Sequence, residues 1–272
     1  MRLELKNVTC GYRNKPVVHQ VSLHVDAGEV LYLLGPNGSG KTTLFKTILG
    51  LLKLQEGETL VDGENIGNWP SHRIARVMGY IPQAHNPPFP YQVLDVVLMG
   101  RTAHLGAFAS PSEIDQQIAE EAIETLNISY LRDKVYTEIS GGERQLVLIA
   151  RALAQQPRIL IMDEPTSNLD FGNQMMVLKQ VQQMARLGLA VVMSSHFPGH
   201  ALLNATKVLL LHKGKVFGAG KPEETITEES LKILFGVDVK IITASIPAHS
   251  DTKVIVPLVH KNGAKQKWPH TP

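Results

Sequence analysis

The sequence predicts an α/β fold built around a mainly parallel sheet. The first observation is a series of short apolar runs with the length and composition of buried parallel strands. The second is that helical patterns stand between several of these runs, as expected when helices connect parallel strands. The third is a glycine-rich segment, GPNGSGKTT, that begins at the end of the first run. The apolar runs cover residues 30–35, 77–82, 159–164, 189–195 and 207–212.

Composition and charge are those of an ordinary globular chain. The 272 residues are 43% apolar and 19% charged, with a net charge of +2, and so nearly neutral a balance gives no support to a nucleic-acid partner. Cys10 is the only cysteine, so an intramolecular disulfide is impossible and the chain is compatible with a reducing compartment. No uninterrupted apolar stretch approaches the roughly 18 residues that span a bilayer, so any membrane role requires a partner.

Helical patterns dominate the middle of the chain. Residues 112–127 predict an amphipathic helix, with Ser112 and Asp115 spaced as a capping box at its start. Because the flanking segments alternate strands and helices, we expect residues 90–155 to form an α-helical subdomain inserted in the α/β core. A proline-rich loop, residues 82–92, leads into it. The predicted apolar face of the helix consists of Ile114, Ile118, Ala122, Ile123 and Leu126.

The glycine-rich segment fits the pattern G-x-x-x-x-G-K-[ST], which predicts a phosphate-binding loop. Its glycines let successive backbone N–H groups point at phosphate oxygens, and the helix that follows adds the positive end of its dipole. Lys41 is expected to neutralise β- and γ-phosphate charge, and the Thr42 hydroxyl to ligate Mg²⁺. The candidate nucleotide-binding residues of this loop are Gly35, Pro36, Asn37, Gly38, Ser39, Gly40, Lys41, Thr42 and Thr43.

Two adjacent acidic residues follow another predicted strand, in the segment ILIMDE. Ligands of such sheets collect at the carboxyl ends of the strands, so Asp163 is expected beside the phosphate loop as a metal-binding residue. Glu164 is the next residue, and its side chain is expected to orient or deprotonate an attacking water. The simpler alternative is a strand-to-turn junction with two solvated acids.

A second helix start with anion-binding character occurs about 100 residues after the first. Ser140, Gly141 and Gly142 directly precede a helical pattern whose apolar stripe includes Leu146 and Ile149. One nucleotide could contact both helix starts if two chains met head to tail. The arrangement therefore predicts a homodimer.

In this order, the motifs resemble those of the ATP-binding subunits of ABC transporters, over residues 1–235. SGGERQ resembles the signature motif of that family, and Gln83 its glutamine loop, a contact to metal or water. Asp170 resembles the aspartate of its dimer-facing loop, His196 its switch histidine, and Tyr12 the aromatic residue that stacks on adenine. The resemblance implies a P-loop NTPase core with an antiparallel β subdomain.

The resemblance also implies the roles of these residues and the identity of the cofactors. It assigns Glu164, His196 and Gln83 to catalysis, and Thr42, Gln83 and Asp163 to the metal. The implied cofactors are ATP, sandwiched between the phosphate loop of one subunit and Ser140 to Gly142 of the other, and Mg²⁺. Ile139 and Asn168 stand where leucine and alanine are usual, and neither change puts activity in doubt.

A narrower resemblance lies in residues 93–115, which contain VLMGR followed by HLG. This stretch is similar to the ATPases of importers for iron-siderophore, haem, cobalamin and related metal-chelate or oxyanion cargo. It implies integral-membrane permease subunits, an extracytoplasmic substrate-binding protein, and a peripheral location on the cytoplasmic face of the cell membrane. We expect residues 83–110 to form a groove for a short cytoplasmic helix of the permease.

Other functions are compatible with parts of the sequence. An exporter ATPase would share every catalytic motif, and only residues 93–115 argue against it. A non-transport nucleotide-sensing module would be expected to lack Glu164 or His196, which are both present. Residues 236–272 are expected to be a C-terminal extension, in which 237–244 and 252–259 pair as a short hairpin and 261–272 form a frayed tail.

Overall fold

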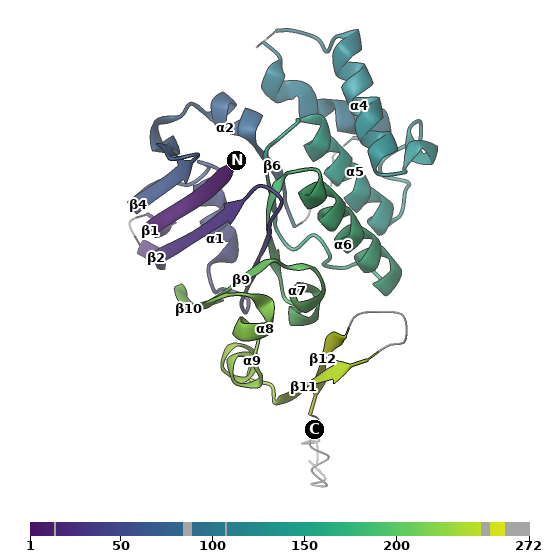
Figure 1. Cartoon of the computed structure of the whole chain (residues 1–272). Coiled ribbons are helices and arrows are strands. Elements are labelled where there is room, and N and C mark those ends of the chain that lie inside the picture. The colour runs from purple at the N-terminus through teal and green to yellow at the C-terminus, as the bar shows by residue number, and fades with distance from the viewer. Residues whose placement is uncertain (14, 84–88, 107, 246–250, 259–272) are drawn as a thin grey trace, which may run out of the picture.

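The computed structural model describes residues 1–13, 15–83, 89–106, 108–245 and 251–258. Its central sheet contains the five predicted strands and one that was not predicted, β10, in the spatial order β10-β9-β3-β8-β7-β6 (Figure 1). Every pairing in this sheet is parallel except that of β10 with β9, so the prediction of a mainly parallel sheet is confirmed. The strands are Lys215–Gly220 (β10), Lys207–His212 (β9), Val30–Leu34 (β3), Ala190–Ser195 (β8), Ile159–Met162 (β7) and Met78–Ile81 (β6).

A separate antiparallel sheet lies beside the central sheet, with the strand order β2-β1-β4-β5 (Figure 1). Its presence confirms the antiparallel β subdomain that the family resemblance implied. Alternate residues of β3 divide the core between two clusters: Leu31 and Leu33 pack with α1 and the antiparallel sheet, whereas Tyr32 packs on the opposite face. The strands are Lys15–Asp26 (β2), Arg2–Tyr12 (β1), Leu54–Val61 (β4) and Glu64–Asn65 (β5), and α1 is Lys41–Ile48.

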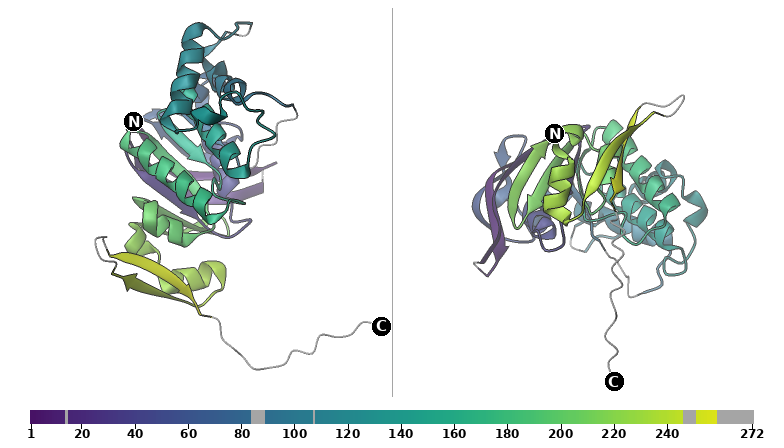
Figure 2. Two further views of the ribbon diagram at one scale, coloured as in Figure 1. Left: turned by 90° about the vertical axis from the view of Figure 1, so that its right-hand side faces the viewer. Right: turned by 90° about the horizontal axis from the view of Figure 1, so that it is seen from below.

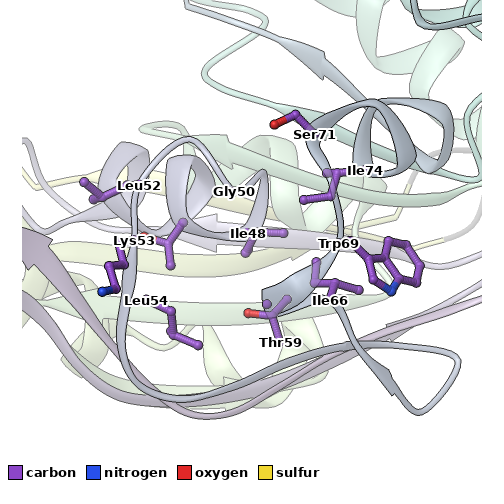
Figure 3. Close-up of a pocket in the computed structure, with 12 residues that line it drawn as sticks. Ile48, Gly50, Leu52, Lys53, Leu54, Thr59, Ile66, Trp69, Ser71 and Ile74 are labelled. Carbon is purple, nitrogen blue, oxygen red and sulfur yellow. The ribbon is translucent and has the colours of Figure 1, made fainter.

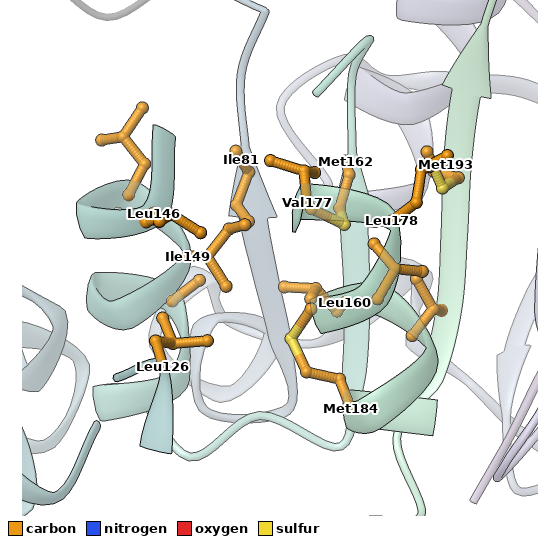
Figure 4. Packing of buried hydrophobic residues seen from close by; sticks show 14 of the residues in the cluster. Ile81, Leu126, Leu146, Ile149, Leu160, Met162, Val177, Leu178, Met184 and Met193 are labelled. Carbon is orange, nitrogen blue, oxygen red and sulfur yellow. The ribbon is translucent and has the colours of Figure 1, made fainter. Parts of the chain in front are cut away.

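Helices α5 (Gly141–Ala154) and α6 (Phe171–Arg186) cover the other face of the central sheet. Leu146 and Ile149 of α5 face Ile81 of β6, and Val177 of α6 lies between Met162 of β7 and Met193 of β8 (Figure 4). These side chains belong to one buried cluster. Parallel strands that are buried on both faces need apolar residues at almost every position. This requirement explains why the predicted strands read as continuous apolar runs.

The segment between β6 and β7 is mostly helical. Ser112 caps α4 and forms the predicted capping box with Asp115, but the predicted apolar face is wrong at its first position, because Ile114 is 67% exposed. Asp115 is buried one residue later, where it pairs with the buried side chain of Arg101. The elements here are Val93–Leu98 (α3), Met99–His104 (η2), Glu113–Thr125 (α4), Ser129–Leu131 (η3) and Gly141–Ala154 (α5).

The remaining helices connect the strands. In the described part of the chain, no helix is both long and apolar enough to cross a membrane. The middle of the proline-rich loop, residues 84–88, lies outside the described residues. These connecting elements are Ile66–Asn68 (η1), Ser71–Val77 (α2), Phe171–Arg186 (α6) and Pro198–Asn204 (α7).

A hairpin ends the described chain at the opposite end of the molecule from α4 (Figures 1 and 2). The segments that were expected to pair form β11 (Val239–Ala244) and β12 (Thr252–Pro257) in antiparallel register. Ile241 and Ile255 pack against the main core, which joins the hairpin to the rest of the fold. Helices α8 (Pro222–Thr225) and α9 (Glu228–Phe235) precede it. The predicted frayed tail lies outside the described residues.

Candidate functional site

The phosphate loop connects β3 to α1 and surrounds a small cavity. Gly40 has a φ of 106°, a left-handed conformation that favours glycine, and α1 begins at the next residue, Lys41. The hydroxyl of Ser39 is buried and has no hydrogen-bond partner among the described residues, as expected of a group awaiting a polar ligand. The cavity measures about 210 Å³ and is lined by Val17, Asn37, Gly38, Ser39, Gly40, Lys41, Thr42, Thr43, Gln83 and Glu164.

The side chain of Lys41 is held inside the phosphate loop by backbone carbonyl groups of that loop. Its Nζ donates hydrogen bonds to the carbonyl oxygens of Gly35, at 2.8 Å, and Pro36, at 3.2 Å, and lies 3.6 Å from Oε1 of Glu164. Burial of the ammonium group lowers the pKa of Lys41, and the charges of Glu164 and Asp163 oppose that shift. An anion with several oxygens could accept charge-assisted hydrogen bonds from this buried ammonium group, so the loop fits a polyphosphate.

Thr42 and Asp163 meet although they are far apart in the sequence. The Thr42 hydroxyl donates a hydrogen bond of 2.7 Å to Oδ2 of Asp163, which is buried at the end of β7. Two such oxygen ligands, with phosphate oxygens and waters for the rest, suit Mg²⁺, which is bound through few protein groups. Among the described residues there is no cluster of three or more His, Cys, Asp or Glu side chains that could hold a metal by itself. The residues present therefore fit a metal that arrives with a nucleotide.

Glu164 is the point on which three side chains from other elements converge. Gln83, which follows β6, donates through Nε2 to Oε2 of Glu164 at 2.8 Å, and Nε2 of His196, which follows β8, lies 2.6 Å from the same oxygen. Lys41 approaches the other carboxylate oxygen. These residues follow β3, β6, β7 and β8, so their convergence results from the alignment of strand ends in one parallel sheet.

The structure does not bring the other candidate residues to this cavity. Tyr12 is half exposed at the end of β1, and Asp170 caps α6 by accepting a hydrogen bond from the backbone N–H of Asn173. Ser140 caps α5, where its hydroxyl accepts from the N–H of Glu143. None of these residues, nor Gly141 or Gly142, lines the cavity. Within a single chain the signature segment is thus separate from the phosphate loop.

Two residues beside the site were not singled out by the sequence analysis. Ser194 makes hydrogen bonds to both Asp163 and Glu164. Asn173 contacts the signature segment, because a Cβ atom on Gly142 would lie 2.2 Å from its Cγ, and its Nδ2 donates to Oδ2 of Asp170 at 2.8 Å. The only sequence signal for Ser194 was a polar residue at the carboxyl end of an apolar run.

A second cavity, of about 350 Å³, lies between α1, β4, η1 and α2 (Figure 3). It contains Trp69, Ile66 and Ile74 and none of the predicted site residues. A third, of about 360 Å³, is formed by α2, β6, η2 and the end of α5, and Met99, Gly100, Thr102 and Ala103 of η2 line one side of it. The η2 side therefore falls within the segment 83–110 that was expected to form a docking groove.

A comparison with protein families agrees with this geometry. The family model described as ABC transporter matches residues 18–167, which include the phosphate loop, the signature segment and both acidic residues. The chain belongs to the ABC transporter family. It is an ATP-binding ABC ATPase, and the α/β fold with its parallel and antiparallel sheets is the fold of that family.

Individual ABC proteins are similar over most of their length. The molybdate import ATP-binding protein MolC of Haemophilus influenzae is 37% identical over 217 residues, which cover 79% of this chain and 80% of the relative. The hemin import ATP-binding protein HmuV of Plesiomonas shigelloides is 35% identical over 255 residues, 87% of this chain and 95% of the relative. A solved metal-chelate type ABC transporter in an inward-facing conformation matches with a TM-score of 0.85 and 34% identity, covering 95% of this chain and 98% of that chain.

Proposed function

We propose that this ABC ATPase powers import of a metal-chelate or oxyanion cargo through a separate membrane permease. The observation that carries the catalytic part is the convergence of Lys41, Gln83 and His196 on Glu164, beside the Thr42–Asp163 pair. Import is supported by the names of the relatives, which are import proteins for molybdate and hemin. An exporter and a non-transport nucleotide sensor are the alternatives, and no contact in the described chain favours either.

The proposed roles follow from position in the site. Gly35 to Thr43 bind the phosphates of ATP, with Lys41 as the charge that contacts them. Thr42, Asp163 and Gln83 hold Mg²⁺, which supplies neutralisation of phosphate charge when it is bound. Glu164 orients or deprotonates the attacking water, and His196 contacts the γ-phosphate. Tyr12 stacks on adenine.

A homodimer is part of the proposal because one chain separates its two anion-binding helix starts. Ser140, Gly141 and Gly142 would contact ATP held by the phosphate loop of a second copy, with Asp170 at the seam between the copies. The exposed position of Ser140 at the start of α5 and of Asp170 at the start of α6 leaves both accessible to a partner. Residues 1–235 would form this ATPase unit, and 236–272 an extension.

The permease is proposed to dock at the cavity between η2, α2 and the end of α5. Met99 is 41% exposed there, and the Nε2 of Gln155 donates hydrogen bonds to the carbonyl oxygens of Ala75 and Met78, which joins α5 to α2. A helix seated in this cavity would contact the segment that leads from Gln83 toward α5. The chain would therefore sit at the cytoplasmic face of the cell membrane as a peripheral subunit, with a substrate-binding protein on the other side.

Crosslinking tests the docking surface. Cysteines placed at Met99 and Ala103 are expected to crosslink to co-expressed permease subunits, whereas a cysteine at Thr243 on the distant hairpin is expected not to. Crosslinks from Thr243 alone would reject this surface.

The Glu164→Gln variant tests the ATPase mechanism. It preserves the side-chain shape but removes the base, so turnover should fall by roughly 10²–10⁴-fold while ATP binding persists. Size-exclusion chromatography with Mg²⁺-ATP should then show a stable dimer. Glu124→Gln, which removes an exposed carboxylate from α4, is the matched control and should behave as wild type. Unchanged turnover in Glu164→Gln would refute the role of Glu164.

A further inference from the structure

Ser194 is a fully buried residue at the carboxyl end of β8, and its side chain contacts both acidic residues of the site. Its relative exposure is 0%. Its hydroxyl donates a hydrogen bond of 2.7 Å to Oδ1 of Asp163 and accepts one of 2.9 Å from the backbone N–H of Glu164. The same hydroxyl group therefore donates one hydrogen bond and accepts another, and its two partners are consecutive residues at the end of β7.

The contact of Ser194 to Asp163 uses only one oxygen of that carboxylate and leaves the other for different partners. Oδ1 is held by Ser194, whereas Oδ2 is the atom that accepts from the Thr42 hydroxyl. The two contacts lie on different oxygens, so the Ser194 bond does not compete with Thr42. A carboxylate held in this way keeps one orientation, and the orientation of a metal-binding group is commonly set by such an outer hydrogen bond.

The contact to Glu164 supports a strained backbone. Glu164 has a φ of 51°, in the left-handed region that is unfavourable for a residue with a side chain. Its N–H is directed into the interior, where an unpaired donor would add a further cost. The Ser194 hydroxyl provides the partner for this N–H. The turn that it stabilises is the one that presents the Glu164 carboxylate to Gln83 and His196.

We propose that Ser194 is a positioning residue of the ATPase site. Its hydroxyl fixes the orientation of the Asp163 carboxylate and the backbone conformation of Glu164 together, so the metal-binding group and the proposed base keep a constant relation to each other. The inference rests on the proposed roles of Asp163 and Glu164 but not on the cargo, the permease or the dimer.

The test compares Ser194→Ala with Thr206→Val. Thr206 is the control, because its hydroxyl likewise accepts from a backbone N–H, although it donates to a backbone carbonyl instead of a carboxylate. Both of its partner atoms belong to Val30, at the far end of the same sheet. Removing the Ser194 hydroxyl should raise the Mg²⁺ concentration needed for half-maximal nucleotide binding by about 10–100-fold. It should lower kcat by a similar factor. Binding of ATP in EDTA should be unchanged, and Thr206→Val should change neither quantity.

Hydrogen exchange gives a reading that needs neither metal nor turnover. In the nucleotide-free protein, the Glu164 amide should exchange faster in Ser194→Ala than in wild type, by a larger factor than the mean of the β8 amides. Ser194→Thr, which retains the hydroxyl, should have the wild-type Mg²⁺ midpoint of nucleotide binding. If Ser194→Ala does not fold, Ser194→Cys, with a weaker donor of similar shape, takes its place in each comparison.

Two results would overturn the proposal. In the first, Ser194→Ala loses stability but keeps the wild-type Mg²⁺ midpoint and kcat, which would make the hydroxyl a purely structural group. In the second, the Glu164 amide keeps its protection. A failure of the proposed catalytic roles would be recognised separately, because Glu164→Gln would then retain turnover whatever Ser194 does.

Discussion

Oε2 of Glu164 lies 2.6 Å from Nε2 of His196, and the same oxygen accepts a hydrogen bond of 2.8 Å from Gln83. With Lys41 at 3.6 Å from Oε1, both oxygens of the proposed base have partners within its own chain. The position of the Glu164 carboxylate is therefore set jointly by residues that follow β3, β6 and β8.

The first prediction concerns His196. His196→Ala should bind ATP normally but lose most turnover, by roughly 10²-fold or more, because Glu164 loses one of the groups that hold it and the γ-phosphate loses its proposed contact. The measurement is ATPase rate at saturating ATP beside affinity for a fluorescent nucleotide. His72→Ala, which removes an exposed imidazole from α2, serves as the control. Full activity in His196→Ala would refute the switch role.

The second prediction concerns the close approach of Gly142 and Asn173. A Cβ atom at position 142 would lie 2.2 Å from Cγ of Asn173, so Gly142→Ala must displace that side chain and with it the hydrogen bond to Asp170. Because only the end of the Asn173 side chain must move, we expect a loss of about 0.5–1.5 kcal/mol in the free energy of unfolding, the usual net contribution of one hydrogen bond.

The neighbouring glycine provides the control for this prediction. A Cβ atom at position 141 meets no atom within 4 Å, so Gly141→Ala should leave the free energy of unfolding nearly unchanged. The double variant Gly142→Ala/Asn173→Ala should recover part of the loss. Equal stability of the two single alanine variants, measured by urea unfolding, would contradict the close approach.

Much of the fold was predictable because the central sheet is buried on both faces. Each strand that packs between two layers must be apolar at consecutive positions, and this requirement is visible without knowledge of the partners. The antiparallel sheet was expected only from the family resemblance, because the pairing of β1 with β4, which joins its two local hairpins, links segments far apart in the sequence. Ile114 was assigned wrongly because periodicity counts apolar residues and cannot show that Arg101, 14 residues earlier, makes burial of Asp115 favourable.

The candidate site was predictable where chemistry and strand ends coincide. Asp163 and the phosphate loop were expected side by side, and the Thr42–Asp163 hydrogen bond shows that they are. Ser194 was missed because a serine in an apolar run is small enough to be read as part of the strand. Its importance depends on the two atoms that it contacts, and a single sequence gives no information on such contacts.

The third prediction concerns acid stability. The pKa of Asp115 is held at about 2, below its ordinary 3.8, chiefly by the hydrogen bond from the Ser112 backbone N–H and then by Arg101. Because the folded-state pKa is the lower one, the stabilisation is fully present above about pH 4 and is lost as the pH falls toward 2. Asp115→Asn should therefore be less stable than wild type at pH 7 and should show a weaker loss between pH 4 and 2.

Thermal unfolding at a series of pH values measures this effect. Glu113→Gln, which changes an exposed acid in the same first turn of α4, should retain the wild-type pH dependence of the melting temperature. A parallel pH dependence in Asp115→Asn and wild type would show that the Arg101–Asp115 pair does not set the acid stability.

The fourth prediction concerns the C-terminal hairpin. Ile241 and Ile255 pack against the main core, and Lys240 of β11 pairs with Glu228 of α9 at 3.0 Å. Truncation after residue 235 would expose the apolar surface that these residues cover, so we expect a lower melting temperature. No catalytic candidate lies in β11 or β12, so the ATPase rate per folded molecule should be unchanged. Truncation after residue 258 keeps both strands and is the control for chain length. If the shorter chain is as stable as the control but hydrolyses ATP at a different rate, the hairpin regulates the site instead of completing the core.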